Sequence, residues 1–452
     1  MTLPREPATP QLDGQEATRA ALLSEQREWR QRKQRCARAF GPAKQAGEDL
    51  APLKAEMQAI TERLDALQAE LDALVPVADA THSTCGEARL DGIVSVPPAD
   101  AADLEVDAAQ LSYTTCGIDE VRDAWQAFVD THPQASLYHD ARWLRLMSDV
   151  FGHAHHAVMC THAGRTLGVL PLLRQRSRLF GDFLTSLPFV NYGGALAASP
   201  AIAEGLMREA GALAARLGCR HVEFRDVQPR AGWPVRSTKV SMRLELPGSS
   251  DALWQRIGSK LRAQVRRPER EGATTRVGGI DLLDAFYAVF CRNMRDLGTP
   301  VYARSWFATL CERFEGQCAI VVVDLGGKPV AAGLLLRHRG QVEIPWASTV
   351  REYNRFGVNM QLYWRCLCWA IEQGATTFDF GRSSIDAGTH RFKAQWGATE
   401  VPLHWHYWLP EGEALPELNP QSGKFQLAIA AWQRLPVPVS RWLGPRIVKY
   451  LP

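Results

Sequence analysis

The stretch "QVEIPWASTVREYNRFGVNMQLYWRCLCWAIEQGATTFDFG", residues 341–381, contains two apolar segments on either side of a long helical segment. Residues 341–349 and 376–381 are rich in β-branched and aromatic side chains, which predicts strands, and 358–373 predicts a helix between them. Two more strands are predicted upstream, at 318–325 and 328–338. The order indicates an antiparallel meander that leads into a strand–helix–strand unit.

The residues before this meander show the same order a second time. Helices are predicted at 252–266 and 282–296 ahead of it. The earlier copy has helices at 118–131, 141–151 and 200–217 and strands at 157–161, 167–173 and 221–227. Such self-similarity indicates an internal duplication. The order is similar to that of GNAT-type acyltransferase domains, in which two central strands splay apart to admit an acyl donor and an amine.

We therefore predict an α/β (α+β) protein with two tandem GNAT-like domains and an N-terminal antiparallel helical hairpin. The domains are expected at 108–247 and 248–410, with a C-terminal tail at 411–452. The hairpin is expected at 16–75, because apolar residues from Leu50 to Leu74 alternate at intervals of three and four. A disordered N-terminus is predicted for 1–15 and a linker rich in Ala, Asp and Pro for 76–107.

The composition is that of a multidomain globular protein. The 452 residues are 46% hydrophobic and the formal net charge is +3, which does not by itself indicate nucleic-acid binding. No segment has eighteen consecutive apolar residues, so we expect a cytoplasmic protein, with a place at the inner face of the inner membrane as a further expectation. Most cysteines stand singly in apolar runs and are expected to be reduced thiols. We expect neither a metal nor a cofactor.

Residues 377–397, "TFDFGRSSIDAGTHRFKAQWG", predict a strand, a polar turn and a short basic helix. Amide formation from an activated ester needs a neutral amine held close and a cation or donor at the developing oxyanion. We assign Lys393 to the oxyanion, Asp379 to the amine and Arg382 to an anionic part of a substrate. Gly381 would allow a ligand close to the backbone, and Phe392 would offer a stacking face.

Other interpretations of these residues remain open. Asp379 could cap a helix or pair with Arg382, and Lys393 could be an exposed helical lysine. Ser383 and Ser384 are expected to shape the turn rather than to act as nucleophiles, because no histidine base lies beside them.

Further candidates lie outside this stretch. Asn191, Tyr192 and the pair Glu223–Arg225 could line a pocket from the first domain. Asn359, and Ser383 within the stretch, are further candidates to contact substrate. A basic helical stretch could bind substrate phosphates, although its period fits an amphipathic helix equally well. Its cationic residues are Lys260, Arg262, Arg266 and Arg267.

Several separated segments resemble the FemAB family in the correct order. They are "LFGDFLTSLPFVNYGGAL", "VFCRNMRDLGTPVYARSWF", "RFGVNMQLYWRCLCWA" and "FDFGRSSIDAGTHRFKAQWGATEVPLHWHYW". The likeness is to the branch associated with exosortase (PEP-CTERM) and exopolysaccharide systems. It implies transfer of an amino acid from aminoacyl-tRNA to an amine of a peptidoglycan precursor or an exopolysaccharide-linked acceptor. Phe392–Lys393 matches the family's Phe-Lys pair at the tRNA terminus and the reacting carbonyl.

The N-terminal segment resembles the tRNA-binding arm of seryl-tRNA synthetases. The resemblance rests on "KQAGED" at the turn and on the heptads that follow. It implies that the basic face of the first helix contacts tRNA phosphates, although a solvated charged face is the alternative. In the studied FemAB ligases the hairpin is inserted in the second domain, whereas here it is N-terminal. The cationic residues are Arg27, Arg30, Lys33, Arg35 and Arg38.

Two other functions are compatible with the sequence. An acyl-CoA-dependent N-acyltransferase of the GNAT superfamily would cradle pyrophosphate ahead of the long helix, where "REYNRFGVN" supplies Gly357 but has Asn359 at the second glycine position. A non-catalytic adaptor would use the hairpin and the tail to recruit partners. In the tail, Trp432, Trp442 and Arg446 could contact a membrane surface, or the tail could pack on the second domain.

Overall fold

The computed structural model describes residues 49–73, 110–177, 180–385, 387–416 and 423–451, together with scattered positions between Thr18 and Ala39. The chain forms two compact units, Met1–Ile93 and Val94–Pro452. The segments predicted as a disordered N-terminus and as a linker lie outside the described residues.

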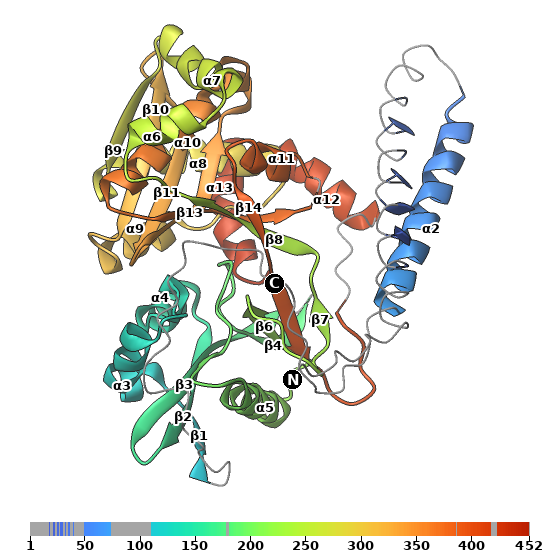
Figure 1. The fold of residues 1–452 in the computed structure, drawn as a ribbon, viewed down its shortest axis with the longest axis vertical. Coiled ribbons are helices and arrows are strands. Elements are labelled where there is room, and N and C mark those ends of the chain that lie inside the picture. Colours follow the sequence, from blue (N-terminus) through green and yellow to red (C-terminus); the bar gives the residue numbers. More distant parts are fainter. Residues whose placement is uncertain are drawn as a thin grey trace, which may run out of the picture. The chain divides into compact units, whose positions relative to one another are not determined.

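The first unit contains helix α2 (Ala51–Ala73) and a helical segment within 18–39 (Figure 1). Arg63 Nη2 donates to Glu25 Oε1 at 2.9 Å, whereas Cys36 Sγ lies 3.5 Å from Leu53 O. Later residues of the first segment therefore meet earlier residues of α2, so the two run antiparallel. Ile60 is fully buried between them. The predicted helical hairpin is confirmed for the residues that the structure describes.

The second unit contains two mixed sheets. The first sheet has the order β1-β2-β3-β4-β6-β15-β7, with β5 paired to β3. Only β4 and β6 run parallel among its described strands. Its strands are β1 (Ser112–Cys116), β2 (Ala154–His162), β3 (Arg165–Ser177), β4 (Gly181–Thr185), β5 (Leu196–Ala197), β6 (Val222–Asp226), β7 (Val235–Arg236) and β15 (His404–Trp408).

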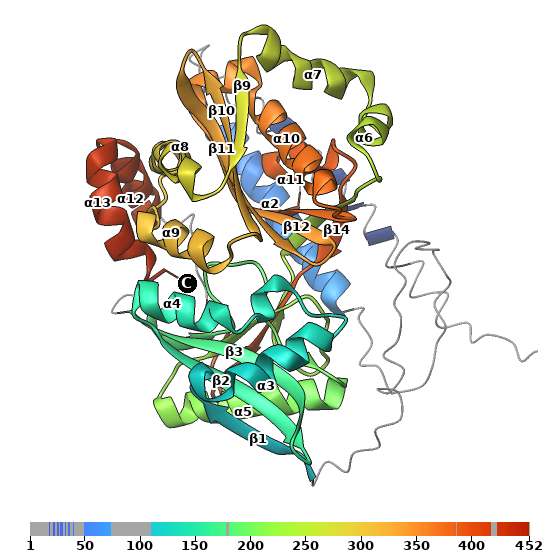
Figure 2. The same ribbon diagram turned by 90° about the vertical axis from the view of Figure 1, so that its left-hand side faces the viewer.

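Helices cover both faces of the first sheet (Figures 1 and 2). Alternate residues of a strand point to opposite faces, so Met159 joins the core under one helical layer and Val158 joins the core under the other. The first layer is α3 (Ile118–Thr131) with α4 (Arg142–Phe151), and the second is α5 (Pro200–Leu217). The predicted helices at 118–131 and 200–217 match α3 and α5.

The second sheet has the order β14-β8-β13-β12-β11-β10-β9, in which β12 and β13 run parallel. It repeats the arrangement of the first sheet, a meander followed by a parallel pair, which confirms the predicted α/β fold with tandem GNAT-like topology. Its strands are β8 (Lys239–Glu245), β9 (Thr274–Gly278), β10 (Cys318–Leu325), β11 (Lys328–His338), β12 (Gln341–Thr349), β13 (Thr377–Ser384) and β14 (Thr399–Pro402).

The second sheet is also covered on both faces. Val321 and Val323 face one helical layer, and Ile320 and Val322 face the other. The expected helix at 252–266 is two helices, because the chain is extended at Ile257. One layer is α6 (Ser250–Arg256), α7 (Ser259–Arg270) and α10 (Val358–Glu372); the other is α8 (Leu283–Leu297) and α9 (Arg304–Arg313).

The sheets do not follow the predicted domain boundaries. Strand β8 precedes residue 248 but lies in the second sheet, between β13 and β14. Strand β15 follows the second sheet in sequence but pairs with β6 and β7 of the first sheet. Each sheet thus contains one strand that the sequence predicts in the other domain. This strand is β15 beside β6 in the first sheet and β8 beside β13 in the second. Strand-like periodicity predicts that a segment is a strand, but not which distant strand it will pair with.

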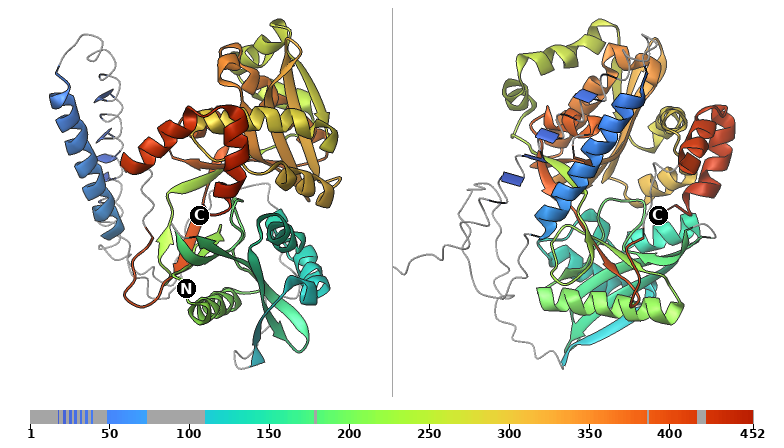
Figure 3. Two further views of the ribbon diagram at one scale, coloured as in Figure 1. Left: turned by 180° about the vertical axis from the view of Figure 1, so that it is seen from behind. Right: turned by 90° about the vertical axis from the view of Figure 1, so that its right-hand side faces the viewer.

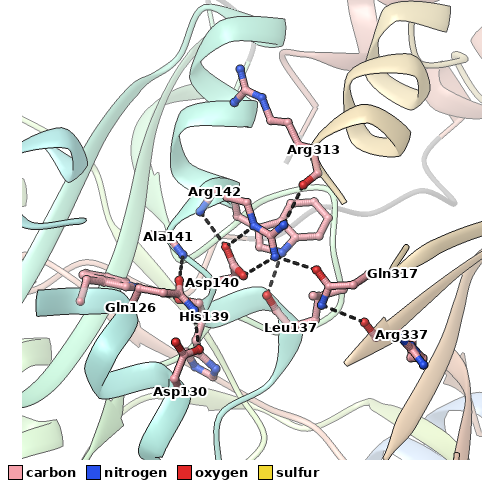
Figure 4. A network of polar contacts seen from close by, with 12 residues as sticks. Gln126, Asp130, Leu137, His139, Asp140, Ala141, Arg142, Arg313, Gln317 and Arg337 are labelled. Atoms are coloured by element: carbon pink, nitrogen blue, oxygen red, sulfur yellow. Dashed lines mark hydrogen bonds and ion pairs between the residues drawn. The ribbon is translucent and has the colours of Figure 1, made fainter. Parts of the chain in front are cut away.

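One hydrophobic core connects the helical layers of the two sheets. Trp143 of α4 lies 4.9 Å, between ring centroids, from Phe314, which follows α9. The Arg142 side chain spans the same junction (Figure 4), where it donates to Arg313 O and Gln317 Oε1, both at 2.7 Å, while it pairs with buried Asp140. The helical layers of the two sheets are therefore joined by packed side chains and by hydrogen bonds.

The tail consists of helices α12 (Gly423–Gln433) and α13 (Val437–Val448), which pack against α8 (Figure 3). Short α11 (Gly388–Ala394) follows β13, as the sequence predicted. Among the described residues, no helix is both long and apolar enough to cross a lipid bilayer. The cysteines in the described part of the chain are unpaired.

Candidate active site

The site lies where β12 and β13 separate. Their parallel ladder joins Gln341 to Thr377, Val342 to Phe378 and Glu343 to Asp379, and the pairing ends there. Beyond this rung, β12 continues beside β11, and β13 continues beside β8. The last rung therefore places two carboxylates side by side at the point where the strands diverge.

Asp379 is fully buried and saturated with hydrogen bonds. Oδ1 accepts from Ser241 Oγ at 2.6 Å and from the Gly381 backbone N–H at 2.7 Å. Oδ2 accepts from Tyr192 Oη at 2.5 Å and from Arg243 Nε at 3.1 Å. The ion-pair partner is thus Arg243 on β8, not Arg382 as one interpretation of the sequence held. Because its acceptor positions are occupied, the carboxylate fits a role in positioning the surrounding strands better than a role in proton transfer.

Glu343 is the residue that sequence reasoning missed. Its carboxyl is buried and accepts a hydrogen bond from Asn191 Nδ2 at 2.7 Å. Burial, and then the neighbouring Asp379 charge, raise the pKa of Glu343 to about 8. An acid in the apolar run "QVEIPW" is the signal that could have identified it. A carboxyl with this pKa can both accept and donate a proton near neutral pH.

Lys393 lies on α11, the helix that follows β13, and its side chain reaches the part of β13 just beyond the β12–β13 ladder. Its side chain is buried, which excludes the exposed helical lysine that was the alternative, and Nζ donates to Gly381 O at 2.9 Å and Arg382 O at 3.0 Å. Burial lowers the pKa of Lys393 to about 8, although Asp379 and Glu343 oppose the shift. An ammonium group has three N–H bonds, so one remains for a further acceptor.

Residues next to Lys393 differ from the expectations in several ways. Gly381 has φ of +73°, and a Cβ there would lie 3.2 Å from Asn191 Nδ2, so glycine serves the backbone conformation and the packing of Asn191 rather than ligand approach. Ser383 and Ser384 lie within β13 instead of in a turn, because β8 pairs with the strand as far as Ser384. Phe392 packs edge-on against Tyr363, with ring centroids 4.9 Å apart.

Arg382 is the free cation of the site. Its side chain is solvent-exposed, and within the described part of the chain no carboxylate lies at ion-pairing distance from it. Its guanidinium carbon lies 4.7 Å from the ring centroid of Trp405, and Arg225 lies over the same ring at 4.4 Å. Although the residue is exposed to solvent, the protein packed around its guanidinium group, and then the Arg225 charge, lower the pKa of Arg382 to about 10. Such a cation is suited to bind an anionic group.

Glu223 and Arg225, also proposed from sequence, neutralise one another. Arg225 Nε donates to Glu223 Oε1 at 2.8 Å, and the Tyr407 hydroxyl donates to Oε2 at 2.8 Å. Burial would raise the pKa of Glu223, but Arg225 and the Tyr407 hydroxyl together lower it. Arg225 of this pair packs against the Trp405 ring. Because Arg225 is already neutralised by Glu223, Arg382 is the residue suited to bind a negatively charged group of a substrate.

A cavity lies at the N-terminus of α10. It has a volume of about 250 Å³ and is lined by Gln264, Arg267, Asn354, Gly357, Asn359, Met360 and Gln395. One lining residue, Gln395, follows directly after α11, the helix that carries Lys393. Arg267 and the Asn359 side chain, close to the N-terminus of α10, suit a phosphate. Asn359, a candidate substrate contact from the sequence, is among the residues that line this cavity.

The other predicted phosphate ligands lie elsewhere on α7. Arg266 packs over the Trp254 ring at 4.9 Å, and Arg262 Nη1 donates to Trp254 O at 3.2 Å. Lys260 is exposed in the first turn. In the hairpin, Arg35 is exposed; the other proposed tRNA contacts, Arg27, Arg30, Lys33 and Arg38, lie outside the described residues.

A family model matches the part of the chain that carries the site. Residues 259–394 match the family model described as an acetyltransferase (GNAT) domain. The solved structure of FemX has 13% sequence identity and a TM-score of 0.49, and the alignment covers 65% of this chain and 96% of that one. A tandem GNAT protein from the clavulanic acid biosynthesis pathway has 12% identity and a TM-score of 0.42, covering 68% and 100%. No curated protein matches in sequence. The family match spans the segments that carry Glu343, Asp379 and Lys393.

Proposed function

We propose that this protein forms an amide by aminoacyl transfer, in the opening between β12 and β13. The observation that carries the proposal is a buried ammonium group, Lys393, which donates to the β13 carbonyls of Gly381 and Arg382, just beyond the rung that holds the buried carboxyl of Glu343. The GNAT domain match supports acyl transfer as the reaction class. The donor would be aminoacyl-tRNA and the acceptor an amine of a cell-envelope component, linked to peptidoglycan or exopolysaccharide.

Lys393 would stabilise the oxyanion. As the amine attacks the ester carbonyl, negative charge develops on oxygen, and the third N–H of Lys393 is available to meet it. The Gly381 and Arg382 carbonyls already hold the ammonium group in place. Little reorganisation is then needed in the transition state.

Glu343 would carry the proton. Once the C–N bond forms, the nitrogen must lose a proton, and when the C–O bond of the ester breaks, the leaving oxygen must gain one. Ionised Glu343 would accept the first proton and supply the second. Its hydrogen bond to Asn191 fixes the orientation of the carboxyl, and Asp379 keeps its pKa high enough for it to act as a base.

Arg382 would hold an anionic part of the acceptor. It is exposed, has no carboxylate partner among the described residues, and lies over Trp405. Arg225 nearby already pairs with Glu223, so Arg382 supplies the positive charge for the anion. An acceptor with a phosphate or carboxylate near its amine fits these contacts.

The donor would enter from the cavity at the α10 N-terminus. A terminal phosphate of tRNA would meet Arg267 and the Asn359 side chain, and the ester would extend along α11 towards Lys393. The basic face of the hairpin, including exposed Arg35, would contact the tRNA body. No metal or cofactor is part of this proposal.

A second candidate is acyl-CoA-dependent N-acyl transfer. It is favoured by the description of the matching family model and by the position of the same cavity, which would take a pyrophosphate. The chemistry at Lys393 and Glu343 would be the same, so only the donor separates the two.

The test offers both donors side by side. Purified protein is incubated with envelope extract and with either radiolabelled aminoacyl-tRNAs or radiolabelled acyl-CoA, and label is counted in an acid-stable amide. Label from tRNA supports the proposal, and label from acyl-CoA alone supports the second candidate. Label from neither, with a folded protein, would favour a non-catalytic adaptor. Lys393→Met should abolish labelling, and Lys328→Met, at an exposed lysine of β11, should not.

A further inference from the structure

Helix α13 presents two different faces. Ser440, Gly444 and Val448 repeat at intervals of four and are buried. A Cβ at Gly444 would lie 2.7 Å from the Val301 backbone N, so this face makes close contact with the segment after α8. The tail therefore packs on the body, which is one of the two possibilities that its sequence left open.

Hydrogen bonds at both ends hold the tail in place. Before α13, Arg295 Nη1 donates to Leu435 O at 3.0 Å. After it, Gln175 Nε2 donates to Leu451 O at 3.1 Å, and His153 Nε2 lies 2.9 Å from Lys449 O. The helix is therefore fixed by its inner face and its ends, and its outer face is not needed for this attachment.

The outer face carries large apolar side chains. Val439 and Trp442 lie three residues apart on α13, with exposures of 38% and 60%, and Tyr450, just after the end of the helix, is 40% exposed. Ile447 beside them is 38% exposed. Trp432, by contrast, is half-buried with its indole nitrogen shielded from solvent, so it belongs to the packed part of the tail.

Cations accompany these side chains. The guanidinium carbon of Arg446 lies 4.2 Å from the Trp442 ring, and Lys449 Nζ lies 4.9 Å from the Tyr450 ring. Residues 423–451 contain no Asp or Glu. Their five basic residues are Lys424, Arg434, Arg441, Arg446 and Lys449.

We propose that the outer face of α13 docks on the surface of an anionic lipid bilayer. Trp and Tyr prefer the region between headgroups and acyl chains, and cations next to them can reach lipid phosphates. Each cation near an anionic surface contributes about fivefold in affinity, and a cluster adds to the apolar contact to give stable attachment. The helix would lie along the surface, because it does not have the length or apolar character to cross it.

The charge of the tail favours an anionic lipid surface over a second copy of the chain as the partner of this face. A symmetric dimer through this face would bring the same cations of both copies together without an acid from the tail to compensate them. An anionic surface has the complementary charge. The inference does not depend on the proposed function, because it uses none of the residues of the opening between β12 and β13.

The test measures co-sedimentation of the full-length protein with sucrose-loaded vesicles of phosphatidylcholine alone or of phosphatidylcholine and phosphatidylglycerol at 3:1. We expect at least tenfold tighter binding to the anionic vesicles, and a loss of most of that binding in Arg446→Glu and in Trp442→Ser. Arg165→Glu is the matched control, because it makes the same charge change at an exposed site on β3. Its binding should stay within twofold of that of the wild type.

Three results would overturn the proposal. They are equal binding to neutral and anionic vesicles, equal loss in Arg446→Glu and Arg165→Glu, and formation of a dimer that Trp442→Ser dissolves. Circular dichroism and melting temperature of each variant identify a folding defect. If Arg446→Glu is unstable, Arg446→Gln and the effect of 0.5 M salt on the wild type answer the same question. Amide formation with a soluble acceptor should be unchanged in Arg446→Glu, which separates this inference from the proposed function.

Discussion

The two sheets have a parallel pair at the same topological position, but the last rungs of those pairs differ. In the first sheet the rung joins Thr185 to Glu223, and in the second it joins Glu343 to Asp379. Thr185 is neutral and donates to Gln175 Oε1 at 3.0 Å. The first rung therefore has one carboxylate and the second has two.

The surrounding residues increase this difference. Glu223 has Arg225 and the Tyr407 hydroxyl as partners, which lower its pKa despite burial. Arg243 pairs with Asp379, so Glu343 has no cation of its own as a hydrogen-bond partner within the described part of the chain, and its pKa rises to about 8. In a duplicated fold, the buried carboxylate of one copy can thus be neutralised by a cation, which favours stability, while the carboxyl of the other copy stays titratable near neutral pH. The predictions that follow test whether this difference decides where the chemistry occurs.

The largest effect is expected at Lys393. Lys393→Met should lower kcat by about 10²- to 10³-fold, as removal of one oxyanion donor does in other enzymes. Substrate KM should change little, because the interaction is made in the transition state. Steady-state kinetics with labelled donor measure both. A kcat within fivefold of the wild type would contradict the role assigned to the buried ammonium.

Glu343→Gln should lower kcat by about 10²-fold, since general base catalysis typically contributes this much. The wild type needs ionised Glu343 with protonated Lys393, so its pH–rate profile should have a maximum near pH 8. The variant should lose the acid limb of this profile. If the acid limb remains unchanged in Glu343→Gln, another group carries the proton.

The same variant should change the pH dependence of stability. The folded pKa of Glu343 is raised from 4.5 to about 8, so its stabilising contribution is complete below pH 4.5 and is lost as the pH rises towards 8. The loss amounts to about 1.4 kcal/mol per pH unit in this window. Urea unfolding at pH 5 and pH 8 should show a smaller decrease in Glu343→Gln than in the wild type.

Substitution of the two arginines over Trp405 should have different effects, on stability for Arg225 and on acceptor binding for Arg382. Arg225→Ala leaves Glu223 buried without its cation, which should lower the unfolding free energy by about 3 kcal/mol. Arg382→Ala removes an exposed cation without a carboxylate partner among the described residues, so stability should change by less than about 0.5 kcal/mol while acceptor KM rises about tenfold. Denaturant melts and acceptor titrations separate the two effects. A normal acceptor KM in Arg382→Ala would exclude it from binding.

The smallest effect on activity is expected in the first sheet. Thr185→Val removes the donor to Gln175 and should lower the unfolding free energy by about 1 kcal/mol. Activity should stay within twofold of that of the wild type, because this rung lies outside the proposed site. A large loss of activity in a stable Thr185→Val protein would show that the first sheet also takes part in the chemistry.

Sequence patterns were reliable where the information is local. The ends of α3 and α5 and the strand–turn–helix order around Asp379 and Lys393 followed from periodicity and from turn residues. These features depend on neighbours within a few residues, so a single segment is sufficient to predict them. Burial of Lys393 was one of two predicted alternatives, and only the fold decided between them.

Pairing between distant segments was decided by tertiary structure alone. The exchange of β8 and β15 between the sheets, the Arg243–Asp379 ion pair and the hydrogen bond from Asn191 to Glu343 each join segments far apart in the chain. The pKa of Glu343 depends on all of these neighbours together. The sequence by itself determined which elements form and which side chains could react. Only the packing of three separate strands, β8, β12 and β13, and the loop that carries Asn191 determined which carboxyl lacks a compensating cation. The physical reason is that the electrostatic environment of a group is set by distance in space and not by position along the chain.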